Sequence, residues 1–300
     1  MKLNIHNTFL IMATLATSNF ILTNCSSSKK LFIAEDLTKE NLFSSNIEGP
    51  AFDKNGQLYV VNYLHDGTIG KVSPEGICSM FIELPKGSIA NCILFDSKDN
   101  MFLPDFTGHN ILHVDMKTQK VSVFCHEPRM YSPNDLCMNR KGQIFASDPD
   151  WKTSVGQLWR VDPNGKPVLL ETNMGTTNGI ELSPDEKTLY VNESIQLTVW
   201  KYDVDENGNI SNKKLFYKFN DFGLDGMKCD KKGNLYIARW GKGAIAVLSP
   251  EGKFIREIPL KGKQSSNLVF GGKNGRTMFV TLQDRKSMEK FENDFPGKKY

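Results

Sequence analysis

Six segments of the 300-residue sequence share one pattern and follow one another at a nearly constant spacing. Each has a polar residue, a short apolar run, a turn with Gly, Asp or Asn, and a strand-like run such as "LYVV" or "LYIA". The leading polar residues are separated by 43, 43, 44, 47 and 42 positions, and they are Glu48, Asn91, Asn134, Asn178, Asp225 and Asn267. Units of roughly 40–50 residues correspond to one four-stranded propeller blade. The sequence therefore predicts an all-β fold, a six-bladed β-propeller.

Other parts of the chain fit this prediction. Further strand candidates lie between the repeats, at 68–73, 121–125 and 157–162, and no long helical period competes with them. A pair of β-sandwiches is the alternative fold, but six evenly spaced units argue against it. The last unit is one strand short, and "KKLFIAEDL" at 29–37 is expected to supply that strand and close the ring.

The beginning of the chain has a different composition. Lys2 is followed by a mostly apolar stretch at 8–24, which is too short and interrupted for a membrane span and is typical of a secretory signal. "LTNC" at 22–25 resembles a lipobox, and "SSSKK" follows it as a tether. We expect a signal peptide of the lipoprotein type over 1–24, a tether and closing strand over 25–38, and the propeller over 39–300. The protein would then be exported, periplasmic or anchored to a bacterial membrane through a lipid on Cys25. An ordinary signal peptide with a nearby cleavage site is the alternative.

Charge and cysteine content exclude other classes of protein. The net charge is only +3 and no basic block occurs, so no nucleic-acid partner is expected. Five cysteines besides Cys25 show no CxxC spacing, which indicates neither a disulfide framework nor a zinc site.

The six leading polar residues are expected to meet at one mouth of the central channel. The innermost strand of each blade lines that channel, so a residue that opens each such strand points at the axis. The set contains two carboxylates and four amides, with no His or Cys. Oxygen ligands of this kind suit a hard cation such as Ca²⁺ or Mg²⁺. The alternative is that Asn and Asp merely form turns at the strand starts.

The ends of the second strands should form the rim of the same mouth. The residues at these ends are Asn62, Tyr63, Asp105, Phe106, Asp148, Asn192, Glu193, Arg239, Trp240 and Gln283.

Four segments resemble the regucalcin/gluconolactonase (senescence marker protein-like) family of six-bladed propeller lactonases. They are "IEGPAFD", "SPNDL", "TNGIELSPDEKTLYV" and "DGMKCDKKGNLYIA", in the family's order. In that family a glutamate, two asparagines and an aspartate bind one catalytic divalent metal. The matching residues here are Glu48, Asn134, Asn178 and Asp225. The resemblance implies one divalent cation, Ca²⁺ first, with Mg²⁺, Mn²⁺ and Zn²⁺ as alternatives.

The resemblance also implies hydrolysis of a lactone, usually a sugar-acid lactone. Asp225 is the expected general base, and Asp135 and Asp148 are alternatives. Substrate contacts are expected from Asn91, Asp148, Arg239, Trp240 and Ser132, where Ser132 stands in place of an arginine of animal members. Aromatic walls are expected from Tyr63, Phe106, Trp151 and Trp240.

Two other functions stay open. The "G-x-L-Y-V" cores also resemble NHL-type repeats, which would make the chain a non-catalytic binding propeller. The same fold and metal could alternatively hydrolyse another ester, such as a phosphotriester. No G-x-S-x-G motif occurs, which disfavours a serine hydrolase.

Overall fold

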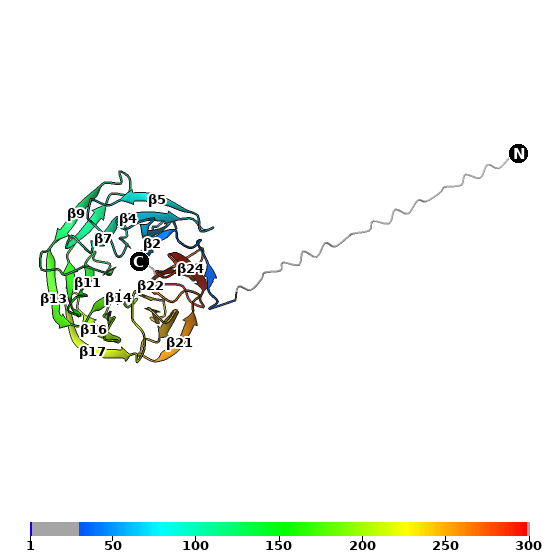
Figure 1. Ribbon diagram of the computed structural model, residues 1–300. Helices are drawn as coiled ribbons and strands as arrows, with labels where there is room; N and C mark the ends of the chain where they lie inside the picture. The colour runs from blue at the N-terminus through cyan, green and yellow to red at the C-terminus, as the bar shows by residue number, and fades with distance from the viewer. Residues whose placement is uncertain (2–29, 299–300) are drawn as a thin grey trace.

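The protein is a ring of six four-stranded antiparallel sheets around a central axis (Figure 1). The computed structural model describes Met1 and residues 30–298, and within this part of the chain every regular element is a strand. The all-β, six-bladed prediction is therefore confirmed. The described residues include no helix long and apolar enough to cross a membrane. The predicted signal peptide, from residue 2 onward, and Cys25 lie outside the described residues.

The strands follow the chain blade by blade. The first two blades are β2 (Phe43–Phe52), β3 (Leu58–Tyr63), β4 (Thr68–Val72), β5 (Cys78–Glu83), and β6 (Leu94–Phe95), β7 (Met101–Asp105), β8 (Asn110–Val114), β9 (Val121–His126). The third and fourth are β10 (Leu136–Met138), β11 (Ile144–Asp150), β12 (Val155–Val161), β13 (Pro167–Met174), and β14 (Thr177–Leu182), β15 (Thr188–Glu193), β16 (Thr198–Val204), β17 (Ile210–Lys218). The last two are β18 (Met227–Cys229), β19 (Leu235–Arg239), β20 (Ala244–Leu248), β21 (Phe254–Pro259), and β22 (Ser265–Gly271), β23 (Thr277–Leu282), β24 (Ser287–Glu292), with β1 (Glu35–Asp36) outermost.

Both faces of each blade are buried, which explains the almost continuous apolar runs of the second strands. Six apolar clusters fill the six spaces between neighbouring blades. Val61 of β3 belongs to a cluster with Leu103 of the second blade, whereas the adjacent Val60 belongs to one with Phe279 of the last blade. Because successive strand residues point to opposite faces, one run such as "LYVV" supplies two interfaces.

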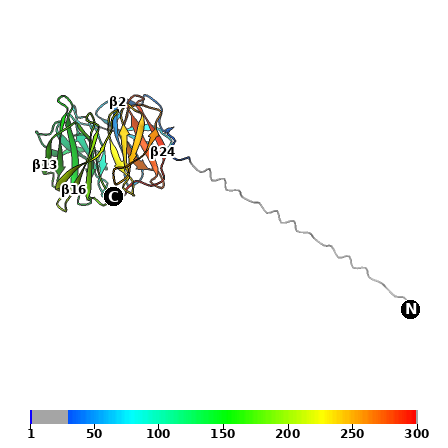
Figure 2. The same cartoon turned by 90° about the horizontal axis from the view of Figure 1, so that it is seen from below.

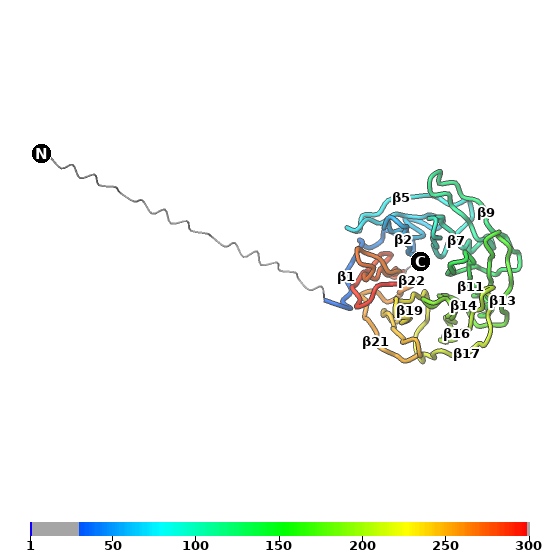
Figure 3. Tube along the Cα trace, turned by 180° about the vertical axis from the view of Figure 1, so that it is seen from behind, coloured from blue at the N-terminus to red at the C-terminus, as the bar shows by residue number. Residues whose placement is uncertain are grey.

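The N-terminal strand closes the ring, as predicted from residues 29–37. β1 pairs with β24, with Glu35 opposite Lys290 and Asp36 opposite Glu289. Figure 3 shows this segment in blue beside the red last strands. Asp36 also forms ion pairs of 2.7 Å with both Lys261 and Arg285. The first and last parts of the described chain thus share one sheet.

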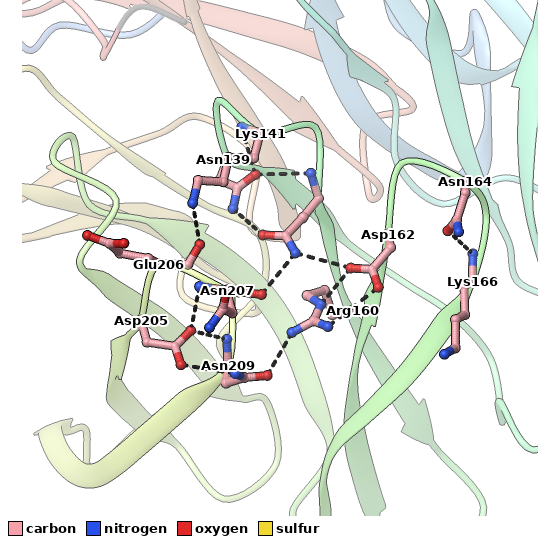
Figure 4. A network of polar contacts seen from close by, with 11 residues as sticks. Asn139, Lys141, Arg160, Asp162, Asn164, Lys166, Asp205, Glu206, Asn207 and Asn209 are labelled. Carbon is pink, nitrogen blue, oxygen red and sulfur yellow. Dashed lines mark hydrogen bonds and ion pairs between the residues drawn. The ribbon is translucent and has the colours of Figure 1, made fainter.

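Turns on one face of the ring are joined by polar networks. Between the third and fourth blades, Gln143 Nε2 donates to the Asn207 carbonyl at 3.0 Å and to Asp162 Oδ1 at 3.1 Å (Figure 4). Arg160 Nη1 donates to Asn209 Oδ1 at 2.9 Å in the same network. These turns join the first to the second strand and the third to the fourth strand, so they lie at the face opposite the starts of the inner strands. The strands run between these two faces in Figure 2.

The segment before residue 299 covers the channel at this same face. Lys231 N donates to the Pro296 carbonyl at 2.9 Å, and Gly297 forms a β-bridge with Asp230. Lys298 Nζ donates to the buried Glu181 carboxylate and, at 2.6 Å, to the Leu182 carbonyl. Gly297 and Lys298 share a cavity of about 180 Å³ with inner-strand residues of all six blades. A larger cavity, of about 510 Å³, lies at the other mouth.

Candidate active site

Five of the six leading polar residues line one cavity of about 510 Å³ at the open mouth. They are Glu48, Asn91, Asn134, Asn178 and Asp225. Each stands where the pairing of its inner strand is irregular. In three blades a backbone bond outside the regular strand pairing precedes the inner strand. These bonds run from Asn91 N to the Pro104 carbonyl, from Asn134 N to the Ser147 carbonyl and from Asp225 N to the Ala238 carbonyl. Glu48 and Asn178 lie at register shifts. Such irregularities re-aim a side chain, here toward the channel.

Glycines beside these residues let the inner strands approach closely. Gly49 has φ +40°, and a Cβ added there would lie 2.4 Å from Cys92 Cα of the next blade. A Cβ at Gly179 would lie 2.4 Å from the Asp225 carbonyl oxygen. Asn192 fixes the same contact, since its Oδ1 accepts from Gly179 N at 3.2 Å and its Nδ2 donates to the Asp225 carbonyl at 2.6 Å. The backbone that carries Asn178 and Asp225 is thereby held in one arrangement.

The two ring carboxylates are buried close to each other. Glu48 is 4% exposed and Asp225 is 7% exposed. Burial raises the pKa of Glu48 to about 8, the Asp135 charge adds to this, and a hydrogen bond from Gly49 N opposes it. Burial also raises the pKa of Asp225 well above its usual range. The negative charges of Glu48 and Asp135 are the next largest causes, and they act in the same direction. A bound cation would favour the ionised form of both groups.

The side chains present fit a hard divalent cation. Asn134 makes no side-chain hydrogen bond with another described residue, so its amide oxygen is available as a ligand. Asn178 hydrogen-bonds to Asp225. Below them, Asp135 is fully buried and its Oδ2 has no hydrogen-bond partner. Residues 30–298 contain no group of three or more His, Cys, Asp or Glu that would hold a metal, so amide oxygens must complete any such site. Two carboxylates with amide oxygens match the ligand preference of Ca²⁺ or Mg²⁺.

The structure places most of the predicted polar rim outside the cavity. Asn62 Oδ1 accepts from Gly67 N at 3.1 Å, and Asp105 Oδ1 accepts from Gly108 N at 3.2 Å. Glu193 similarly accepts from Gly175 N at 2.8 Å. These side chains tie down the loops at the open face, so their position at strand ends reflects loop anchoring.

Asp148 belongs to this anchoring group, although we predicted a substrate contact. Its carboxylate accepts from Tyr131 N at 2.9 Å, Ser132 N at 2.6 Å, Gln157 Nε2 at 2.7 Å and Trp159 Nε1 at 2.9 Å. The Ser132 side chain is likewise absent from the cavity wall. Asp148 therefore positions the segment that leads to Asn134.

Arg239 was also predicted to contact substrate, but its side chain does not line the cavity. It is 1% exposed, and its guanidinium lies 2.6 Å from Asp221 Oδ1 and 2.8 Å from Glu257 Oε1. The same group stacks on Phe219 at 3.9 Å. Arg239 holds the loop before β18 instead of facing the cavity. Tyr63 is another predicted wall residue that the cavity does not include; its ring packs edge-on against Phe43 at 5.7 Å.

Predicted and unpredicted residues complete the cavity wall. The predicted ones are Phe106, Trp151, Trp240 and Gln283, and the unpredicted ones are Ser194, Ile195, Leu197, Phe222 and Gly223. The latter lie in loops without strand periodicity. Their only sequence signal is an apolar side chain inside a short polar segment, as in "ESIQLT" and "NDFGLD".

Comparisons with known proteins agree with this architecture. The model of the SMP-30/Gluconolactonase/LRE-like region matches residues 47–284. A gluconolactonase of Zymomonas mobilis is 28% identical over 270 residues, which cover 78% of this chain and 75% of the relative. A diisopropyl-fluorophosphatase of Loligo vulgaris is 27% identical over 284 residues, 84% of this chain and 90% of the relative. The solved structure of a calcium-binding protein, regucalcin, from Agrobacterium tumefaciens superposes with a TM-score of 0.75 at 20% identity, covering 91% of this chain and 95% of that one.

Proposed function

Because the chain belongs to the SMP-30/gluconolactonase/LRE-like family, we propose that it is a divalent-metal-dependent hydrolase that opens a small lactone. The observation that carries this proposal is the pair of buried carboxylates, Glu48 and Asp225, with two amide side chains at the base of a 510 Å³ cavity. A cavity of this size suits a small molecule. The gluconolactonase of Zymomonas mobilis supports lactone hydrolysis as the reaction.

The proposed reaction consumes one water. The water oxygen forms a bond to the lactone carbonyl carbon, the acyl C–O bond of the ring breaks, and the ring oxygen receives a proton. The product is an open hydroxy acid, which ionises to its carboxylate. A divalent cation, held by Glu48, Asn134, Asn178 and Asp225, would polarise the carbonyl and stabilise the negative charge that develops on its oxygen.

Asp225 is the proposed acceptor of the water proton. It lines the cavity, and its backbone is fixed by Asn192 Nδ2 at 2.6 Å. The alternatives are less well placed. Asp135 is fully buried beneath the ring and absent from the wall, and the four donors around Asp148 hold it outside the cavity.

The cation and the substrate are narrower proposals. Oxygen ligands favour Ca²⁺, with Mg²⁺, Mn²⁺ and Zn²⁺ as the other ions to test. The family resemblance favours a sugar-acid lactone. A phosphotriester or phosphofluoridate is the second candidate, since the Loligo vulgaris relative is a diisopropyl-fluorophosphatase. A binding propeller without activity is the remaining alternative.

Activity measured after chelation tests the proposal. Exhaustive chelation should abolish hydrolysis across a panel of lactones, and one divalent cation should restore it. Asn134→Ala should weaken the apparent metal affinity roughly 10–100-fold or more, since even residues that only support metal ligands have effects of that size. Excess cation should rescue this variant.

Two further variants complete that experiment. Asp225→Asn removes a ligand charge and the proposed base together, so excess cation should not restore its activity fully. Asn164→Ala is the matched control, because Asn164 is exposed in a turn on the opposite face. Undiminished activity after chelation would refute metal dependence, and a panel in which no lactone reacts with any of the four cations would refute the enzymatic function.

A further inference from the structure

The wall above the polar ring is mainly apolar. Its large apolar side chains come from loops of several blades, and they are Phe106, Trp151, Ile195, Leu197, Phe222 and Trp240. Four of them are well exposed: Trp151 39%, Ile195 54%, Phe222 50% and Trp240 39%. Single exposed apolar residues are ordinary, but a contiguous set around a cavity marks a binding surface.

Above the polar ring, the polar groups of this wall are those of Ser194, Gln283 and the Trp240 indole, and each already forms a hydrogen bond. The Ser194 hydroxyl donates to the Leu224 carbonyl at 2.5 Å, and Gln283 Oε1 accepts from Trp240 Nε1 at 2.9 Å. The charged side chains in the wall are Glu48 and Asp225, both at its base. A substrate with several hydroxyl groups would find few free partners above the ring, and buried hydroxyl groups without partners weaken binding.

Phe222 gives a second, independent observation. Its φ of +45° is unusual for a bulky residue, yet half of the side chain is exposed. Neighbouring contacts hold this conformation: Gly223 N donates to the Trp240 carbonyl at 2.9 Å, and Arg239 binds both the carbonyl and the carboxylate of Asp221 at 2.6 Å. The backbone at Phe222 is strained, while its phenyl ring lies near Gly241 and the residue stays half exposed. Backbone strain of this kind is typical of ligand sites.

We propose that the preferred substrates are lactones with an alkyl or aryl substituent, which lies against Phe222, Ile195 and Trp240 while the ring carbonyl faces the polar ring. This inference rests on the proposed lactonase function and narrows its substrate class. An apolar substituent gains from burial against this wall, whereas the hydroxyl groups of a sugar-acid lactone do not.

The test uses three lactones with the same six-membered ring. They are unsubstituted δ-valerolactone, δ-decanolactone with its alkyl chain, and glucono-δ-lactone with its hydroxyl groups. With the most activating cation, and after correction for spontaneous hydrolysis, kcat/KM for δ-decanolactone should exceed that for glucono-δ-lactone by about tenfold or more, equivalent to 1.4 kcal/mol.

Variants locate the preference in the wall. Phe222→Ala should reduce the ratio of kcat/KM for δ-decanolactone over δ-valerolactone about tenfold, mainly through KM, and Ile195→Ser should act in the same direction. Leu215→Ser is the matched control, because Leu215 is equally exposed at 55% but lies on the outer strand β17. Thermal melts confirm that each variant is folded.

The outcomes separate this inference from the proposed function. A preference for glucono-δ-lactone, or an unchanged ratio in both folded wall variants, would overturn the apolar substrate class and leave the lactonase intact. No hydrolysis of any of the three lactones with Ca²⁺, Mg²⁺, Mn²⁺ or Zn²⁺ would instead refute both.

Discussion

Asp148 and Asp225 are both buried aspartates near the open mouth, but their surroundings differ. Asp148 is held by four N–H donors from the loop and from the third strand of its own blade. Asp225 faces Glu48 and Asp135, whose charges raise its pKa further. N–H donors stabilise the negative charge of a buried carboxylate by themselves. Neighbouring carboxylates repel that charge, so a bound cation or a proton is needed to compensate it. Asp225 therefore fits a metal site, and Asp148 fits a structural anchor.

Replacing Asp148 should affect stability. Asp148→Asn substitutes an NH₂ group for one accepting oxygen among four donors, so the free energy of unfolding should fall by about 2–4 kcal/mol. The melting temperature should drop by roughly 5–15 °C. Ser132→Ala is the control, because only the backbone N–H of Ser132 meets Asp148. If Asp148→Asn melted like the wild type while its KM for substrate rose, direct substrate contact would be the better explanation.

Sequence reasoning predicted the ring at the axis but not the rim. The spacing of the repeat identifies six equivalent positions, and five of them line one cavity: Glu48, Asn91, Asn134, Asn178 and Asp225. The sixth, Asn267, is absent from that wall. At the strand ends, adjacent residues point to opposite sides. Trp240 lines the cavity and Arg239 does not. The repeat pattern does not determine which of these two adjacent side chains faces inward. Ile195 and Phe222 lie in irregular loops, whose path depends on tertiary contacts that no period reveals.

At the scale of elements, closure of the ring depends on the two-residue strand β1. Besides its pairing with β24, Asp36 binds Lys261 and Arg285, and Arg285 also binds Glu40 at 2.7 Å. The hydrogen bond from Lys261, followed by that from Arg285, lowers the pKa of Asp36 below its usual value of 3.8. The position of this closing strand was predictable because the last repeat lacked one strand.

The contribution of Asp36 should depend on pH. Because its pKa is lowered on folding, the stabilisation is present above the unfolded pKa of 3.8 and is lost as the pH falls through the lower folded value. Asp36 is about half exposed, so Asp36→Asn should cost only about 0.5–1 kcal/mol at pH 7, or roughly 1–4 °C in melting temperature. The difference from wild type should shrink toward pH 3.

A neighbouring residue provides the control for this experiment. Glu35 lies beside Asp36 in β1, but its carboxylate forms no ion pair in the described part of the chain. Glu35→Gln should therefore melt within about 0.5 kcal/mol of the wild type at both pH values. A difference for Asp36→Asn that stayed constant from pH 7 to pH 3 would show that its ion pairs do not stabilise the closure.

At the scale of the whole molecule, the two mouths of the channel differ. Gly297 and Lys298 cover one mouth, while the other opens into the cavity above Glu48 and Asp225. The polar ring therefore belongs to the cavity at the open mouth and not to the one at the covered mouth. The first described residues after Met1, from residue 30 onward, lead into β1 at the outer edge of the last blade, away from the axis (Figure 3).

We propose that the protein is exported and anchored through Cys25, on the basis of the apolar segment 8–24 and "LTNC" at 22–25. Mass spectrometry of the native N-terminus should find a chain that begins at a lipid-modified Cys25. Cys25→Ser should release the protein from the membrane fraction, while Ser27→Ala should not. An intact Met1 on a cytoplasmic protein would contradict export, and a cleaved but unmodified N-terminus would contradict the lipid anchor alone.

Metal titration of chelator-treated protein by isothermal calorimetry tests most directly whether the buried ring is a metal centre. With Ca²⁺ the wild type should bind one ion per chain, and Glu48→Gln and Asp225→Asn should each bind it roughly 10–100-fold or more weakly. Asp115→Asn, which alters an exposed turn aspartate, should bind like the wild type. Absence of binding to the wild type for Ca²⁺, Mg²⁺, Mn²⁺ and Zn²⁺, or wild-type affinity in both ring variants, would contradict a metal site built from these residues.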